Sequence, residues 1–253
     1  MGKSWKIVSF MAKEKEFNNT RITSASKLRL LSFNPNSIGK NPKRAKILQA
    51  LRKKNANIIL ISDTRLSKEI EPTVKNEWGG KANFASYTSQ ARGVAVLFDK
   101  NLAIEISEAS IYNDKSGNFT VLNIKYENFI ITISCIYGPN HDDPDFYEKV
   151  VFQEIQKCQE MSDFCIIGGD WNIALDQSLD TFGYTTENNI NAKKYILTGL
   201  ENLGLVDIFR YLKKKIYLET IWRNQTCQTR FLPCFFYFAA FCSKRGHSAW
   251  YQL

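Results

Sequence analysis

The sequence has few of the residues that build zinc or disulfide sites. It contains two histidines, and its six cysteines include no pair at C-x-x-C spacing, which disfavours a zinc site. Cys135 and Cys165 lie in apolar, strand-like runs, where a thiol acts as a small hydrophobic group. We therefore expect reduced cysteines and an intracellular protein, nuclear or cytoplasmic.

Long apolar runs are also missing. The longest, residues 231–242, has 12 residues and includes Pro233, whereas a membrane span needs roughly 20. No hydrophobic leader core precedes the N-x-T sequon at Asn18, because residues 1–20 hold only short apolar stretches between charges. These absences disfavour secretion and membrane insertion.

The residues that are present suit a packed, basic protein. With 253 residues, of which 44% are hydrophobic and 13% aromatic, the chain can bury the core of one large domain. Its 34 Lys and Arg against 25 Asp and Glu give a net charge of +9, which favours a polyanionic partner. A basic helix predicted over residues 43–54 either contacts phosphates or simply carries a solvated charged face. Its basic residues are Lys43, Arg44, Lys46, Arg52, Lys53 and Lys54.

Short β-branched runs alternate with helical patterns along the chain. Some neighbouring strands are close enough to form hairpins, and others are separated by helices, which favours an α/β fold of two sheets covered by helices. The predicted strands are residues 28–33, 58–61, 84–88, 93–98, 119–125, 129–137, 164–170, 206–209 and 220–223, and the predicted helices are residues 43–54, 144–159 and 192–203.

The most informative segment is the strand end at residues 168–172. An apolar run leads into Gly168 and Gly169, which let the backbone bend and a ligand approach closely. Asp170 and Asn172 follow two residues apart, so in an extended segment both side chains point the same way. Taken alone, the segment equally suits a polar turn.

Three further strand ends carry side chains of the same chemical kind. Carboxylate and carboxamide oxygens suit Mg²⁺ or Mn²⁺. Each strand end alone also suits an ordinary turn or cap, but four in one chain favour a common oxygen-rich site. The residues are Asn34 with Asn36, Asp63, Tyr137 with Asn140, and Asp170 with Asn172.

Taken together, the order and spacing of the motifs are specific, although no single motif is. The motifs are residues 32–34 (SFN), 59–66 (ILISDTRL), 91–97 (ARGVAVL), 136–140 (IYGPN), 167–172 (IGGDWN), 205–210 (LVDIFR) and 220–223 (TIWR).

This set resembles the endonuclease/exonuclease/phosphatase superfamily. More narrowly, it is similar to the apurinic-type endonuclease domain of non-LTR (LINE-like) retrotransposons. The resemblance implies an α/β two-sheet sandwich flanked by helices. We expect an N-terminal extension over residues 1–26, the endonuclease-like domain over residues 27–230 and an off-pattern tail over residues 231–253.

The resemblance also implies Mg²⁺-assisted (or Mn²⁺-assisted) hydrolysis of a DNA phosphodiester by a monomer, with a reverse transcriptase domain once in the same polypeptide. Asn34 and Asp63 would hold the metal ion. Asp170 would orient or deprotonate the attacking water, helped by Asn172. The other implied residues are Tyr137 and His247, as catalytic residues, and Asn36, Asn140 and Arg92, as substrate-binding residues.

Two departures from the family pattern bear on activity. Asp63 stands where most members have Glu, which shortens the carboxylate arm by about 1.5 Å. Leu232 and Gly246 stand where the family has the two acidic residues of its last motifs, so His247 would lack its orienting acid. Residues 231–253 contain no acidic residue at all, which led us to the hypothesis of a frame change. We expect the last strands of the fold to be missing and the stability to be low.

The leading interpretation is a DNA-nicking endonuclease of the retrotransposon type with weak or no activity. A catalytically inactive nucleic-acid-binding remnant is the alternative from another class. An abasic-site repair nuclease or a phosphatase of the same superfamily is the enzymatic alternative. The target sequence does not follow from motif spacing.

Overall fold

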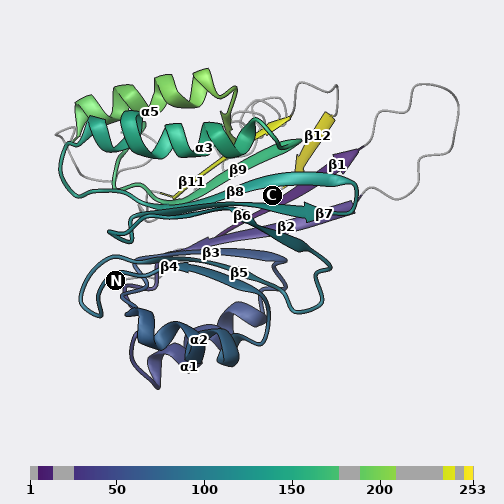
Figure 1. Cartoon of the computed structure of the whole chain (residues 1–253), viewed down its shortest axis with the longest axis vertical. Coiled ribbons are helices and arrows are strands. Elements are labelled where there is room, and N and C mark those ends of the chain that lie inside the picture. Colours follow the sequence, from purple (N-terminus) through teal and green to yellow (C-terminus); the bar gives the residue numbers. More distant parts are fainter. Residues whose placement is uncertain (1–4, 14–25, 177–188, 209–235, 243–247, 253) are drawn as a thin grey trace, which may run out of the picture.

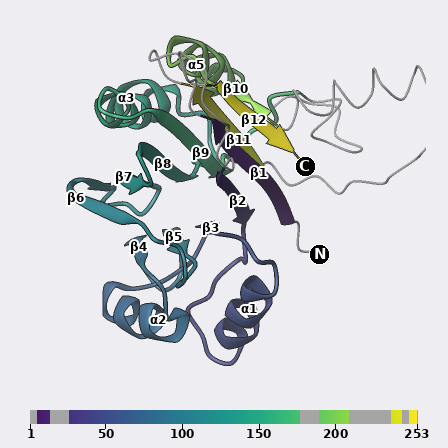
Figure 2. The same ribbon diagram turned by 90° about the vertical axis from the view of Figure 1, so that its right-hand side faces the viewer.

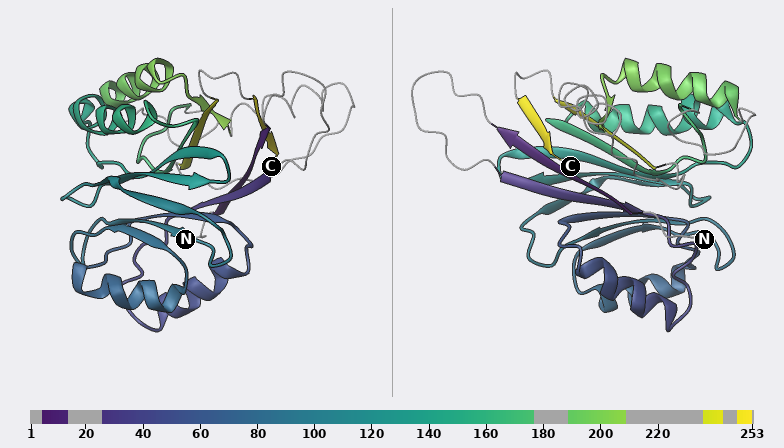
Figure 3. Two further views of the ribbon diagram at one scale, coloured as in Figure 1. Left: turned by 45° about the vertical axis from the view of Figure 1, so that its right-hand side comes forward. Right: turned by 180° about the vertical axis from the view of Figure 1, so that it is seen from behind.

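The computed structural model describes residues 5–13, 26–176, 189–208, 236–242 and 248–252. These residues form two β-sheets packed face to face, with helices on the outer face of each sheet (Figure 1). This is the α/β sandwich that the sequence predicts. The view from behind shows the same layers (Figure 3).

The first sheet combines both ends of the chain with its first half. Its strand order over the described residues is β12-β1-β2-β3-β5-β4. Only β2 and β3 of this sheet pair in parallel, with Phe33 opposite Ile61. The strands are β1 (Trp5–Lys13), β2 (Ser26–Phe33), β3 (Ile58–Ser62), β4 (Ala82–Ala85), β5 (Val94–Phe98) and β12 (Ser248–Gln252).

The second sheet comes mainly from the middle of the chain. Its order over the same residues is β10-β11-β9-β8-β7-β6. Here β8 and β9 are the parallel pair, with Tyr137 opposite Asp170. The strands are β6 (Glu105–Asn113), β7 (Phe119–Tyr126), β8 (Phe129–Tyr137), β9 (Phe164–Asp170), β10 (Val206–Asp207) and β11 (Phe236–Cys242).

The helices cover the two outer faces. Helices α1 (Lys43–Arg52) and α2 (Glu71–Trp78), with the short 3₁₀ turn η1 (Lys68–Ile70), lie on the first sheet. The π-helical turn η2 (Phe146–Val151), α3 (Phe152–Gln159) and α5 (Ile190–Asn202) lie on the second.

Successive side chains of a strand point to opposite faces of the sheet, and both faces are covered, so the sequence of each such strand is a continuous apolar run. In β3, Ile58 and Leu60 join the core between the two sheets, whereas Ile59 and Ile61 join the core beneath α1 and α2. Strand β9 divides in the same way between the central core and the core beneath α3 and α5. A strand covered on both faces must be apolar throughout, which is what the sequence shows.

Several predicted elements are confirmed within a few residues, but one strand was missed. Strands at 28–33, 93–98 and 129–137 appear where the sequence places them. Strand β6 was not predicted, because it is a half-exposed edge strand with polar residues and a register shift between Ser107 and Tyr112. The predicted strand at 220–223 lies outside the described residues.

The tail corrects the expectation that the last strands are missing. Strand β11 pairs antiparallel with β9, with Phe236 opposite Asp170, and β12 pairs with β1 (Figure 2). Strand β1, from the predicted N-terminal extension, pairs in turn with β2. A family motif is a weak guide to strand formation here, because the aromatic-rich run at 236–242 has high β propensity whatever its family match. The division into extension, domain and tail stays a prediction.

Candidate functional site at the strand ends

The candidate site lies where the parallel strands of both sheets end. Strands β2 and β3 end side by side in the first sheet, and β8 and β9 end side by side in the second. Just beyond these ends a hydrogen bond links the two pairs, since the Asn34 amide Nδ2 donates to Asp170 Oδ2 at 2.8 Å. The strand ends that the sequence singles out therefore meet at one edge of the sandwich.

Asp63 follows β3 and is held by Arg65. The Arg65 guanidinium donates to both carboxylate oxygens, with Nε to Oδ1 at 3.0 Å and a terminal nitrogen to Oδ2 at 2.9 Å. The Asp63 residue is only 3% exposed. Its φ of 55° is left-handed, a conformation that Asp tolerates better than most residues.

Asn34 bridges the sheets through its two amide atoms. Besides the bond to Asp170, its Oδ1 accepts a hydrogen bond from the Asn36 backbone N–H at 2.8 Å. Lys43, on α1, donates to the Pro35 carbonyl oxygen at 3.0 Å and to the Asn36 carbonyl oxygen. The loop after β2 is thus tied down at its start, which fixes the orientation of Asn34.

Among the described residues, the hydrogen-bond donors to the Asp170 carboxylate are uncharged. Asn34 bonds one oxygen, and the Asn172 backbone N–H donates to the other at 3.1 Å. Burial raises the pKa of Asp170; these two hydrogen bonds oppose the rise, and the nearby negative charge of Asp63 adds to it. A carboxylate with a raised pKa is a better proton acceptor than an ordinary Asp.

Gly169 explains why a glycine must precede Asp170. Its φ is 134°, and a Cβ atom placed there would lie 2.0 Å from the Ile136 carbonyl oxygen. Any side chain would push β9 away from β8. The sequence analysis expects glycine here to let a ligand approach closely; at Gly169 the group that approaches closely is the backbone of the neighbouring strand.

Tyr137 and Asn172 lie beside the two carboxylates. The Asn172 amide donates to the Gly138 carbonyl oxygen at 2.6 Å, and its φ is 53°. Burial raises the pKa of the Tyr137 hydroxyl, the charges of Asp63 and Asp170 raise it further, and a hydrogen bond with Asn172 and the charge of Arg65 oppose the rise. Tyr137 therefore stays protonated and can donate a hydrogen bond.

The remaining predicted residues lie at the rim or outside the description. Asn36 and Asn140 are exposed on loops next to the strand ends. The Arg92 guanidinium lies 5.3 Å from the centre of the Tyr87 ring, and Tyr87 is 47% exposed. His247 lies outside the described residues.

The basic helix divides into structural and exposed residues. Arg44 is buried and bonds both carboxylate oxygens of Glu77, at 2.7 and 2.9 Å. Arg52 stacks 5.4 Å from the centre of the Trp78 ring. Both arginines fasten α1 to α2, whereas Lys43, Lys46 and Lys53 are exposed and Lys54 is half-buried.

Sequence reasoning gave no role to three residues that support the site. Arg65 holds Asp63. Asn118 donates from its amide to the Tyr137 carbonyl oxygen at 2.8 Å, and the Tyr147 hydroxyl donates to the Trp171 carbonyl oxygen at 2.8 Å. Only Arg65 left a local signal, because it lies two residues from a candidate acid.

The donor chemistry fits a divalent cation. Asp63 and Asp170 are close enough for one charge to affect the pKa of the other, and Arg65 neutralises one of the two negative charges. Mg²⁺ is typically held by one or two carboxylates, with waters and substrate phosphates completing the shell. No group of three or more His, Cys, Asp or Glu suited to a metal occurs within the described residues. A metal here would therefore rely on amide, water and phosphate oxygens as well.

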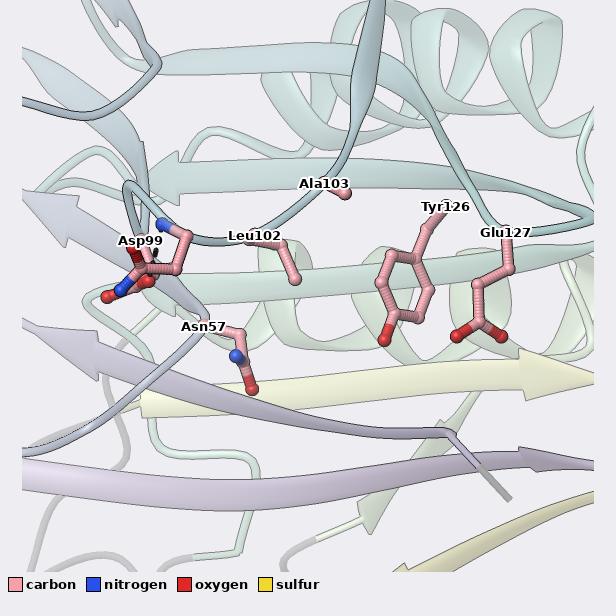
Figure 4. A pocket seen from close by; sticks show the side chains of 7 residues that line it. Asn57, Asp99, Leu102, Ala103, Tyr126 and Glu127 are labelled. Atoms are coloured by element: carbon pink, nitrogen blue, oxygen red, sulfur yellow. Dashed lines mark hydrogen bonds between the residues drawn. The ribbon is translucent and has the colours of Figure 1, made fainter. Parts of the chain in front are cut away.

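A separate pocket of about 470 Å³ lies at the other end of the sandwich (Figure 4). It is lined by the residue before β3, Asn57, by Asp99 after β5, and by Tyr126 and Glu127 at the β7–β8 turn. It shares no residue with the candidate site. None of the helices described is long and apolar enough to cross a membrane.

Several solved nuclease structures share this fold. The structure resembles the catalytic domain of Xenopus laevis APE2 (TM-score 0.59, 16% identity, 83% of this chain and 81% of that one). It also resembles the endonuclease domain of TRAS1, a telomere-specific non-LTR retrotransposon (TM-score 0.52, 17% identity, 86% and 85%). An AP endonuclease from Archaeoglobus fulgidus gives a TM-score of 0.57 at 18% identity, over 84% and 86% of the two chains.

One curated relative matches by sequence. The "Transposon TX1 uncharacterized 149 kDa protein" of Xenopus laevis is 22% identical over 193 residues, which cover 75% of this chain but 13% of the relative. No family model matches the chain. The resemblance to the superfamily is confirmed as a fold, and the transposon relative agrees with the narrower resemblance to non-LTR endonucleases.

Proposed function

We propose that this chain is a divalent-metal-dependent endonuclease that nicks DNA, of the non-LTR retrotransposon type. The observation that carries the proposal is the hydrogen bond from Asn34 to Asp170. It joins the two sheets at the strand ends and brings Asp170 within electrostatic reach of Asp63. An acid with a raised pKa beside an acid suited to a cation fits metal-assisted hydrolysis of a phosphodiester.

Asp170 acts on the attacking water in this proposal. Its oxygens accept hydrogen bonds from Asn34 and Asn172, so the carboxylate is held in one orientation while it accepts a proton. Burial and the nearby charge of Asp63 favour the protonated form, which increases its strength as a base. Positioning of the water in line with the leaving oxygen is the main contribution expected of such a group.

Asp63 and the Asn34 amide oxygen hold Mg²⁺ or Mn²⁺ in this proposal. A bound divalent cation would act as a Lewis acid on the phosphate or leaving oxygen. Tyr137, which stays protonated, donates a hydrogen bond to a phosphate oxygen, and Asn172 assists it.

DNA is the partner that the rim of the site favours. Arg92 stacked against exposed Tyr87 presents both a cation and an aromatic face beside the strand ends. Asn36 and Asn140 are exposed on adjoining loops and complete the proposed substrate contacts. We also propose an intracellular monomer whose polypeptide once included a reverse transcriptase domain. The length of the transposon relative, of which this chain matches 13%, supports the last point.

Nicking of supercoiled plasmid tests the proposal. We expect the wild-type protein to nick the plasmid with Mg²⁺ or Mn²⁺ and not with EDTA. Asp170→Ala should reduce the rate by about 10²- to 10⁴-fold, the range typical for a general base. Glu108→Ala, which alters an exposed acid on edge strand β6, is the matched control and should nick like wild type. Equal nicking by wild type and Asp170→Ala would contradict the proposal.

The alternative is a catalytically inactive remnant that still binds nucleic acid. Leu232 and Gly246, which replace the acids of the family pattern, favour it. Both positions lie outside the described residues. Metal-independent binding of duplex DNA without nicking would support the remnant. Cleavage confined to a plasmid that carries abasic sites would instead favour an abasic-site nuclease.

A further inference from the structure

We propose that Arg65 is an internal counter-cation of the metal site, which a divalent cation must displace or share in order to bind Asp63. The inference rests on the proposed function, because it takes Asp63 as a metal ligand. It assigns a role to Arg65, which is not among the site residues predicted from the sequence.

The contact between the two side chains is specific. The guanidinium approaches the carboxylate with two hydrogen bonds, at 3.0 and 2.9 Å, so each carboxylate oxygen accepts one. Such paired bonds are stronger and more directional than a single-point contact. The Asp63 side chain is 4% exposed and that of Arg65 is 35% exposed, so the cation is the more accessible member of the pair.

The backbone on both sides holds the pair in place. Asp63 and Arg65 both have left-handed φ values, 55° and 50°. The Ser37 N–H donates to the Asp63 carbonyl oxygen at 2.9 Å, and the Arg65 N–H donates to the Arg92 carbonyl oxygen at 2.7 Å. Because loops on two sides fix this segment, the contact is part of the fold and not a chance surface pair.

The contact between Arg65 and Asp63 depends on the short side chain of aspartate. An Asp carboxylate lies nearer to its own backbone than a Glu carboxylate would, by about 1.5 Å. A residue two positions further on can then reach both oxygens, as Arg65 does. In this site the arginine stabilises the buried charge of Asp63 when no metal ion does so.

Two consequences follow for binding. A divalent cation placed against Asp63 repels the guanidinium, so metal affinity is lower than the same donors would give without Arg65. In the structure the guanidinium already lies within electrostatic reach of Tyr137. Once displaced from Asp63, it would be available to a DNA phosphate.

Titration of the full chain with Mn²⁺, followed by the loss of the free-ion electron paramagnetic resonance signal, tests the inference without relying on activity. Arg65→Gln should bind Mn²⁺ roughly tenfold more tightly than wild type, since one charged pair no longer competes. Arg65→Lys should fall between the two, because an ammonium group bonds one oxygen and leaves the other free. Lys46→Gln removes an equal charge from an exposed position on α1 and should match wild type.

The same titration separates the two hypotheses. If Asp63→Ala binds Mn²⁺ as tightly as wild type, Asp63 is no ligand and the proposed metal site is wrong. If Asp63→Ala loses binding while Arg65→Gln and Arg65→Lys bind no more tightly than wild type, only the role of Arg65 is overturned. Circular dichroism melting of each variant identifies those that fold, and Arg65→Lys keeps the test decisive if Arg65→Gln does not.

Discussion

The two halves of the candidate site surround their aspartates with different hydrogen-bond donors. In the first sheet, Asp63 is paired with a charged guanidinium that bonds both its oxygens. In the second sheet, Asp170 is bonded by an amide and a backbone N–H, both uncharged. One acid is ion-paired with an arginine, and burial raises the pKa of the other. The difference teaches that two identical residue types gain separate roles from their neighbours.

The separation depends on the way each half is built. Asp63 lies in a segment with two left-handed residues that backbone hydrogen bonds hold in place. Arg65, from the same segment, bonds the Asp63 carboxylate. Asp170 ends a buried strand, and its carboxylate accepts hydrogen bonds from the Asn34 amide and the Asn172 backbone N–H. The Asn34 side chain links the two halves directly at Asp170.

The largest expected effect is on stability, and we expect it for Gly169→Ala in strand β9, in the second half of the site. The new Cβ would meet the Ile136 carbonyl oxygen at 2.0 Å in a backbone conformation that L-residues rarely adopt. We expect a loss of about 3 kcal/mol or more in the free energy of unfolding, measured by urea denaturation. Gly93→Ala is the matched change in the first half; its φ is 92°, and there the Cβ meets the Thr64 hydroxyl oxygen at 2.3 Å but no backbone atom closer than 3.5 Å. A Gly169→Ala protein as stable as Gly93→Ala would contradict this account of β9.

Loss of the hydrogen bond from Asn34 to Asp170, which links the two halves, should have the next largest effect, here on nicking. Asn34→Ala removes a hydrogen bond that orients Asp170 and lowers its pKa. The nicking rate should fall by about 10²-fold, as for misplacement of a catalytic group, and the acid limb of the rate profile should move to higher pH. Asn140→Ala, at an exposed position, should leave that limb where it is. An unshifted acid limb in Asn34→Ala would show that the link does not tune Asp170.

Tyr137→Phe should have a smaller effect on nicking. The substitution keeps the ring packed and removes the hydroxyl that we propose donates to a phosphate oxygen. We expect about a tenfold loss in single-turnover nicking rate, close to the 1.4 kcal/mol of one ordinary hydrogen bond. An unchanged rate would remove Tyr137 from the catalytic set.

The smallest expected effect is a change in melting temperature, and it distinguishes Asp170 from Asp63. Because the folded-state pKa of Asp170 is raised, its ionised form destabilises the folded protein at neutral pH. Asp170→Asn should therefore raise the melting temperature in EDTA at pH 7.5, by about 2–4 °C for each kcal/mol relieved.

The pH dependence of that difference has a definite direction. Wild-type protein loses stability as pH rises from the unfolded-state pKa, about 3.9, through the raised folded-state pKa, and the Asn variant does not. The gain of Asp170→Asn should thus shrink as pH falls toward about 4. Asp63→Asn should lower the melting temperature instead, because it leaves Arg65 without its anion. A stabilising Asp63→Asn would show that the two acids are alike.

Local sequence patterns predict the parts of this structure that depend on strand ends. Asn34, Asp63, Tyr137 and Asp170 each end or follow an apolar run, and parallel pairing brings such ends together. The pairing of Arg65 with Asp63 was not predicted, because it requires two left-handed residues that no periodicity reveals.

Long-range contacts account for the other differences. Strand β11 pairs with β9 across more than sixty residues of sequence, and its aromatic run carries no signal for that partner. Asn118 supports Tyr137 through a side chain that reads as part of a turn. Edge strand β6 is half exposed and bulged, so neither alternation nor apolar continuity marks it.

Side-by-side Mn²⁺ titration of Asp63→Ala and Asp170→Ala tests the division between the two halves most directly. Asp63→Ala should lose Mn²⁺ binding, because the carboxylate that Arg65 now neutralises is the proposed ligand. Asp170→Ala should bind Mn²⁺ within a few-fold of wild type while failing to nick DNA. Equal loss of Mn²⁺ binding in both variants, or in neither, would contradict the assignment of the metal to one sheet and the proton to the other.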